Sequence, residues 1–306
     1  MNNYKGIIYA ILSSIAFGIM PIFAKIAYKN GSNPTSSLLF RFLISGLILL
    51  LYLNFKKVSI KISVKQFLLL FFIGMFGYTI TTITLFVSYN YLDSGLATAL
   101  HYIYPALVCI FSFILYKENI TKEKIFSLVL SIIGVYSLIA FESKTLNILG
   151  IFLALFSGLA YALNVISLSF KSIKSIDNRV VTMYICFGAS LGMIIYGAFT
   201  ESLTFTINLE MMISYLGLSI ISTIASMLFL LKAIKLIGST SASILATFEA
   251  VVSIIMGIIF LNEKLTFALI LGTSLIIIST TILAREKSPK PCDQYNKLSN
   301  AIDINH

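Results

Sequence analysis

Residues 66–90 run for 25 positions without a charged side chain, and long apolar stretches recur along the whole chain of 306 residues. A helix needs about 20 residues to cross the roughly 30 Å hydrocarbon core of a bilayer. Every backbone polar group must be satisfied internally there, which favours helices. The segments do not alternate apolar and polar residues over ten positions, as strands of a membrane barrel do. The sequence predicts an all-α integral membrane protein.

The composition excludes the main soluble classes. The chain is 58% hydrophobic and 11% charged, whereas an ordinary soluble domain is about 25% charged. A soluble globule of this size has no interior that could hide so much apolar surface. A water-soluble enzyme, a nucleic-acid-binding protein and a disordered scaffold are therefore all excluded.

Ten stretches are apolar and long enough to be transmembrane helices. They are residues 6–28, 35–54, 66–90, 94–116, 124–140, 148–170, 180–199, 209–233, 239–261 and 265–284. With the N-terminus inside, alternate loops carry 17 Lys and Arg residues on the cytoplasmic side and 4 on the other. An excess of Lys and Arg is typical of loops on the cytoplasmic side of a membrane. We expect a multi-pass protein of the cytoplasmic membrane with both termini in the cytoplasm.

The two halves of the chain resemble each other. At an offset of 145 residues or one fewer, similar residues recur in both halves. The pairs are Gly6/Gly150, Ser13/Ser157, Ala16/Ala160, Phe17/Tyr161, Ser94/Ser239, Ala97/Ala242, Leu100/Leu245, Glu118/Glu263 and Thr121/Thr266. We expect one five-helix repeat over residues 1–144, a second over residues 145–287, and a disordered cytoplasmic tail over residues 288–306.

Because five is odd, the second repeat enters the membrane inverted relative to the first. Inverted repeats are a common way to build an alternating-access carrier, since each half can adopt the conformation of the other. The duplication therefore predicts transport, although an old duplication kept only for packing is the alternative.

The whole chain resembles a ten-helix member of the drug/metabolite transporter superfamily, built from two EamA-type repeats. The resemblance rests on three groups of residues. They are Phe17, Pro21, Lys25 and Arg41; Ser94, Gly95, Leu96, Ala97, Pro105 and Glu118; and Phe248, Glu249, Ala250, Glu263, Lys264 and Gly272. The chain departs from the family at Phe17 and Tyr161, where Trp is frequent, and at Ala250, where Pro is frequent. The resemblance implies a secondary transporter with a central cavity lined by helices 1–4 and 6–9.

Glu249 is the most informative single residue. It falls at the centre of the ninth span, where an ionised carboxylate is costly and normally faces the bundle interior or water. It is a candidate for coupling to protons and for binding a cation or substrate. The alternative is a hydrogen-bonded acid that ties helices together.

His101 lies in the fourth helix, at the position that matches Ala246 of the second repeat. An imidazole can relay protons or contact a substrate, so His101 is the second coupling candidate, and a packing histidine is the alternative. Tyr102 and Tyr104 flank it. Aromatic rings suit apolar or cationic substrates, but membrane helices also use them for packing.

Arg41 lies inside the second span and could hold a substrate carboxylate or phosphate, or it could extend to the interface. The remaining candidates for substrate binding are Phe17, Tyr78, Tyr161 and Asn164. Glu118 and Glu263 each precede a helix, where a carboxylate complements the helix dipole, and are interpreted as structural.

The sequence contains no ATP-binding loop and no zinc-protease or serine-triad signature. We expect no enzymatic activity, no catalytic residues, no cofactor and no metal. We expect a secondary transporter for a small organic solute, such as an amino acid, an amine or a lipophilic metabolite, with protons as a candidate coupling ion, and membrane lipid as its surroundings. The alternative function is a non-transporting membrane scaffold or sensor. The oligomeric state stays open.

Overall fold

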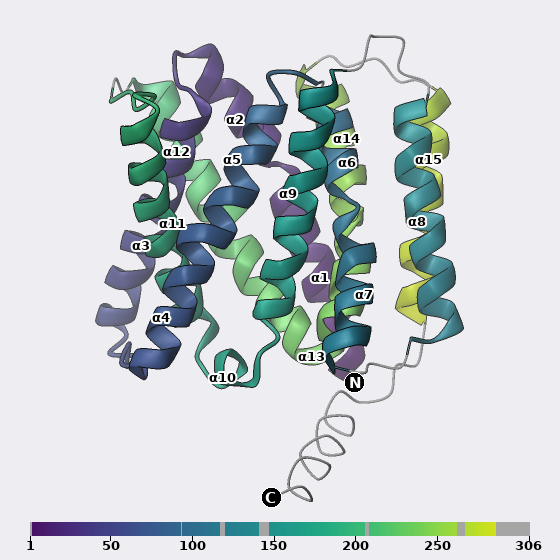
Figure 1. Ribbon diagram of the computed structural model, residues 1–306, viewed down its shortest axis with the longest axis horizontal. Helices are drawn as coiled ribbons and strands as arrows, with labels where there is room; N and C mark the ends of the chain where they lie inside the picture. The colour runs from purple at the N-terminus through teal and green to yellow at the C-terminus, as the bar shows by residue number, and fades with distance from the viewer. Residues whose placement is uncertain are drawn as a thin grey trace, which may run out of the picture.

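The computed structural model describes residues 2–92, 94–116, 120–140, 147–205, 208–261 and 267–285, and every regular element in these ranges is helical. The helices are α1 (Asn2–Gly18), α2 (Met20–Lys29), α3 (Pro34–Phe55), α4 (Val64–Phe72), α5 (Thr79–Ser88), α6 (Ser94–His101), α7 (Tyr104–Tyr116), α8 (Lys122–Ala140), α9 (Ile148–Ser167), α10 (Lys171–Lys174), α11 (Asn178–Phe199), α12 (Leu209–Ser219), α13 (Ser226–Ala246), α14 (Phe248–Leu261) and α15 (Phe267–Arg285). Two π-helical turns, η1 (Ile73–Tyr78) and η2 (Ile220–Ala225), connect α4 to α5 and α12 to α13. Figure 1 shows the elements as an elongated bundle.

Six segments of the described chain are long and apolar enough to cross a membrane, which confirms an all-α integral membrane protein. They are Tyr4–Lys29, Pro34–Phe55, Val64–Ser88, Ile148–Ser167, Asn178–Phe199 and Leu209–Phe260. The last contains 52 residues, and Gly238 divides it with non-helical angles of φ 81° and ψ 167°. That region of conformational space is almost restricted to glycine. The break falls between the expected eighth and ninth spans.

The predicted arrangement of ten helices as an inverted repeat stays a prediction. The expected fourth span is divided into α6 and α7, each too short to cross a membrane alone. The structural roles predicted for Glu118 and Glu263, and the tail predicted over residues 288–306, lie outside the described residues.

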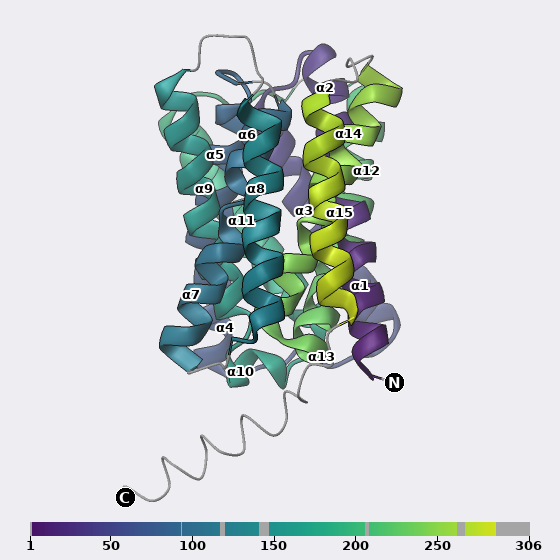
Figure 2. The same cartoon turned by 90° about the vertical axis from the view of Figure 1, so that its right-hand side faces the viewer.

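The most extensive helix contacts join the first half of the chain to the second. The pairs are α1 with α13, α8 with α15, α3 with α11, η1 with α11, and α5 with α9. In Figures 1 and 2, α8 and α15 lie side by side at one edge of the bundle. The two halves thus interlock and do not form separate bodies.

Hydroxyl side chains connect these helices in the interior. Ser13 Oγ donates to the Ser226 carbonyl at 2.9 Å, and Ser279 Oγ donates to the Ser127 carbonyl at 2.5 Å. Lipid tails are as apolar as leucine side chains, so the hydrophobic effect does not drive helices together within a membrane. Hydrogen bonds between helices contribute to their association instead.

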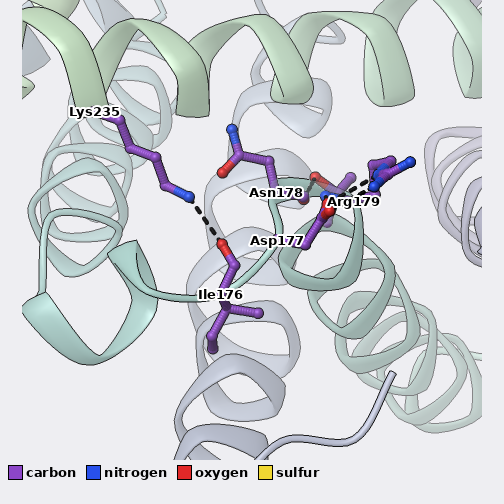
Figure 3. A network of polar contacts seen from close by, with 6 residues as sticks. Ile176, Asp177, Asn178, Arg179 and Lys235 are labelled. Atoms are coloured by element: carbon purple, nitrogen blue, oxygen red, sulfur yellow. Dashed lines mark hydrogen bonds and ion pairs between the residues drawn. The ribbon is translucent and has the colours of Figure 1, made fainter. Parts of the chain in front are cut away.

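The loop before α11 is held by charged side chains (Figure 3). Lys235 Nζ of α13 donates to the Ile176 carbonyl at 2.8 Å. Asp177 caps α11 by accepting from the Arg179 backbone N–H at 2.8 Å, and the two side chains form an ion pair at 2.6 Å. The bonded Arg179 guanidinium lowers the pKa of the Asp177 carboxyl below its ordinary value.

Candidate functional site

Two helix breaks define the centre of the candidate site. The α-helical hydrogen-bond pattern is interrupted at Tyr102 and Ile103, between α6 and α7. It is interrupted again at Thr247, between α13 and α14, although the backbone angles of Thr247 stay in the right-handed helical region (φ −59°, ψ −18°). Tyr102 and Thr247 are 145 residues apart, which is the offset between the two halves. The first break has a clear cause, because Pro105 has no N–H to donate and disfavours helix geometry in the residue before it.

The second break forms without proline, since Ala250 stands at the position that matches Pro105. The Thr247 hydroxyl donates to the Ile244 carbonyl at 2.7 Å, and the Thr247 N–H donates to the same carbonyl at 3.2 Å. These bonds satisfy the carbonyl from within the last turn of α13. Side-chain bonds of this kind compete with the helical ladder, and here they coincide with the end of α13.

An aromatic cluster fills the space beside the first break. The His101 ring lies 5.4 Å from Tyr104 and 5.3 Å from Tyr161, between ring centroids, and Tyr104 and Tyr161 are 4.7 Å apart, edge to face. Tyr102 lies 5.8 Å from Tyr104, and Tyr78 lies 6.4 Å from Tyr161. The cluster therefore unites α6, α7, η1 and α9.

The hydroxyl group of Tyr78 is buried and has no hydrogen-bond partner, and that of Tyr102 is buried with no bond of ordinary geometry, although the Glu249 carboxylate lies close to it. A buried polar group without a partner costs about 1–3 kcal/mol, so such groups are uncommon in a packed interior. Two of them in one aromatic cluster indicate a place where a bound polar group would be stabilised.

Glu249 is half-buried in the first turn of α14, two residues after the second break. Its carboxylate interacts electrostatically with Arg41, and the Tyr102 hydroxyl lies close to it without forming a hydrogen bond of ordinary geometry. The N-terminus of a helix carries a partial positive charge, which favours an anion in the first turn. Because α14 begins at the break, the Glu249 carboxylate lies near the positive end of a helix, which would not be the case in one continuous helix.

Arg41 is buried and held by protein groups. Its Nε donates to Thr223 Oγ1 at 2.6 Å, and its two terminal nitrogens contact the Met20 sulfur and the Ser222 carbonyl, each at 2.9 Å. Thr223 and Ser222 belong to η2, so Arg41 connects α3 to this π-helix. A π-helical turn frequently marks a functional site.

Asn164 contacts the other π-helix and the turn that follows it. Its amide nitrogen donates to Thr81 Oγ1 at 3.0 Å. A Cβ atom on Gly77 of η1 would overlap Asn164 Oδ1. Glycine at this position therefore lets α9 approach η1 closely enough to place Asn164.

The comparisons with known proteins decide the family. A model of the EamA-like transporter family matches the chain twice, over residues 4–140 and 148–285. The chain belongs to the EamA-like transporter family. The resemblance inferred from its residues is thereby confirmed, and the protein is a membrane transporter.

Individual EamA-like relatives are more distant. YvbV of Bacillus subtilis strain 168, named an uncharacterized transporter, is 29% identical over 202 residues, which are 64% of this chain and 65% of the relative. The chain thus matches slightly less than two thirds of that protein. Protein PecM of Dickeya dadantii strain 3937 is 22% identical over 89% of this chain and 92% of its own. A crystal structure with 13% identity matches with a TM-score of 0.76 over 90% of this chain and 95% of its own, which shows a shared fold.

The structure brings most of the predicted site residues together in this EamA-like protein. His101, Tyr102, Tyr161 and Tyr78 lie in one cluster, with Glu249 and Arg41 in electrostatic range of it. Asn164 lies one turn from Tyr161 on α9. Phe17 belongs to the same buried core cluster as Tyr78 and Tyr102, and its neighbour Gly18 faces the Glu249 backbone, so its role in substrate binding stays a prediction.

Sequence reasoning named Tyr104 only as an aromatic neighbour of His101, without listing it as a substrate-binding candidate, and it did not connect Ser157 with the site. Tyr104 is buried between His101 and Tyr161, and Ser157 is the hydrogen-bond partner of His101 at 2.8 Å. Ser157 has a match at Ser13 of the first repeat, but that pairing indicates the duplication and not a contact with histidine. Among the described residues no group of histidine, cysteine and acidic side chains could hold a metal ion.

Proposed function

We propose that this protein is a secondary transporter of the cytoplasmic membrane that moves a small organic solute by alternating access. Amino acids, amines and lipophilic metabolites are the solute classes. The proposal includes ten transmembrane helices in two inverted repeats, residues 1–144 and 145–287, with both termini and the tail 288–306 in the cytoplasm. The observation that carries it is the meeting of an aromatic cluster and a half-buried carboxylate at two helix breaks in matching positions.

Broken helices are suited to this task. In transporters, discontinuous helices place their half-helix ends at the bilayer midplane, where they bind substrates and coupling ions. Here one break positions His101 and Tyr102, and the other positions Glu249. A solute between the two breaks would contact groups from both halves of the chain. Movement of one half against the other would then change the side of the membrane from which the solute can be reached.

The side chains favour a solute that has an apolar body and a polar or cationic group. The ring faces of Tyr102, Tyr104 and Tyr161 can bind a cation or an apolar surface. The buried Tyr78 hydroxyl supplies a hydrogen-bonding group without a partner, and the Tyr102 hydroxyl supplies a second one beside the Glu249 carboxylate. Glu249 supplies a carboxylate that can bind a proton or an ammonium group in turn. In this proposal Glu249 and His101 are the coupling residues.

A binding screen tests this proposal. The detergent-purified protein is heated with amino acids, amines, nucleosides and lipophilic cations at mildly acidic and neutral pH. A ligand of the folded state raises the melting temperature by mass action. We expect a stabilising compound among the amines and amino acids, whose effect is lost in Glu249→Gln and kept in Glu210→Gln, a matched change at an exposed acid of α12. No stabilisation by any compound would instead favour the scaffold function.

A further inference from the structure

A second candidate site lies on the outside of the bundle, away from the aromatic cluster. A crevice of about 460 Å³ opens between α1, α15 and the break that separates α13 from α14. Its lining consists of Tyr4, Ile7, Ile11, Leu245, Phe248, Ile277, Thr281 and Arg285. Figure 2 shows α1 and α15 near each other on this side of the bundle.

The crevice is apolar along its length and cationic at one end. Ile7, Ile11 and Ile277 form its walls, and the guanidinium of Arg285 lies where α15 ends. Lys5 is exposed at the same end of α1 as Tyr4. Neither α1 nor α15 contains an acidic residue within its bounds.

The position of the crevice determines which molecules can reach it. α1 belongs to a segment that is apolar enough to cross the membrane, and the crevice walls Tyr4 and Ile277 are 74% and 44% exposed. Exposed apolar surface on the helices of a membrane protein faces lipid. Tyr4 and Ile11 are seven residues apart, which corresponds to about 10 Å along a helix and fits part of one acyl chain.

We propose that this crevice binds one anionic glycerophospholipid of the bilayer. An acyl chain lies between α1 and α15, and the phosphate group pairs with Arg285. Basic residues near a membrane surface attract anionic lipids. The guanidinium of Arg285 lies beside the apolar crevice, so it holds the lipid phosphate at one defined place while the acyl chain lies in the crevice. The inner end of the crevice is formed by Leu245 and Phe248, which flank Thr247. The bound lipid therefore contacts the break that positions Glu249.

Fluorescence quenching by brominated lipid tests the proposal, because the chain contains no tryptophan. Tyr4→Trp places a single fluorophore at the crevice, and Tyr136→Trp places one at a 66% exposed position of α8 outside it. Both variants are reconstituted into vesicles of phosphatidylcholine and phosphatidylglycerol of one composition. The bromine atoms are carried either by the phosphatidylglycerol or by an equal amount of the phosphatidylcholine.

We expect Tyr4→Trp to be quenched more strongly by the brominated phosphatidylglycerol, with an association preference of about fivefold, as one basic residue near the surface provides. The preference should disappear when Arg285→Gln is added, a change at an exposed helix end that leaves the fold intact. Tyr136→Trp should be quenched equally by both lipids. Equal quenching of Tyr4→Trp, or a preference that is unchanged by Arg285→Gln, would overturn the proposal.

Discussion

The Nδ1 atom of His101 lies 2.8 Å from the hydroxyl oxygen of Ser157. The Ser157 hydroxyl also lies 2.7 Å from the Ala154 carbonyl of its own helix. Its single proton can point to either acceptor, so the donor and acceptor roles of the His101 ring follow from which bond the hydroxyl donates. In either arrangement the bond joins the end of α6 to α9 at the first helix break.

Ser157→Ala removes this hydrogen-bond partner and leaves the buried Nδ1 atom of His101 unsatisfied. An unsatisfied buried donor or acceptor costs about 1–3 kcal/mol, so the variant should unfold at lower temperature and bind ligand more weakly than the wild type. Ser167→Ala is the control, because Ser167 bonds only the Leu163 carbonyl of its own helix. Equal melting temperatures for the two variants would show that the His101–Ser157 bond contributes nothing.

Arg41→Lys tests whether the guanidinium fork is needed to hold η2. Lysine keeps the charge but cannot reach Thr223 Oγ1 and the Ser222 carbonyl in the same geometry. Hydrogen bonds to charged groups contribute about 1.5–3 kcal/mol each, and we expect a loss of stability of about 2 kcal/mol, together with loss of transport. Arg179→Lys, at a partly exposed ion pair, should change stability by less than about 0.5 kcal/mol. A stable, fully active Arg41→Lys would contradict this role.

Gly77→Ala tests the placement of Asn164. The added Cβ overlaps Asn164 Oδ1, so the alanine should displace the amide from Thr81, lower the melting temperature and weaken ligand binding. The double variant Gly77→Ala/Asn164→Ala removes the overlap. It should therefore be more stable than expected from adding the two single changes. Strict additivity in this double-mutant cycle would show that the two residues do not interact.

Asp177→Asn tests the charged cap of α11. Because Arg179 lowers the pKa of the Asp177 carboxyl in the folded protein, the stability it contributes is present above the ordinary carboxyl pKa. That contribution is lost as the pH falls through the lowered value. The substitution should reduce stability at neutral pH by a few tenths of a kcal/mol, and the difference from wild type should vanish in acid. A stability difference between Asp177→Asn and the wild type that stays constant with pH would show that the ionisation of Asp177 does not contribute to stability.

The sequence predicted the membrane helices because apolar length and a lack of charge are local properties. It also predicted that Glu249, His101 and the tyrosines belong to one site, because intramembrane polar groups face the bundle interior. The break at Tyr102 has a local signal in Pro105, but the break at Thr247 does not, since Ala250 replaces the proline. The two π-helical turns likewise have no sequence signal of their own.

The partners of the site residues could not be predicted, because they depend on contacts between distant parts of the chain. His101 and Ser157 are 56 residues apart, and Arg41 and Thr223 are 182 apart. Arg41 was a candidate for binding a substrate anion, and in the structure its guanidinium contacts protein groups at three atoms. Only the packing of α3 against η2 reveals those partners.

Proton-driven uptake into proteoliposomes tests the central claim most directly. The wild type, Glu249→Gln and Glu210→Gln are reconstituted with a pH-sensitive dye inside, and uptake of the compound identified by the binding screen is followed under an imposed pH gradient. We predict that the wild type and Glu210→Gln accumulate the compound while the gradient dissipates, and that folded Glu249→Gln does neither. Accumulation by Glu249→Gln at the wild-type rate would contradict the account.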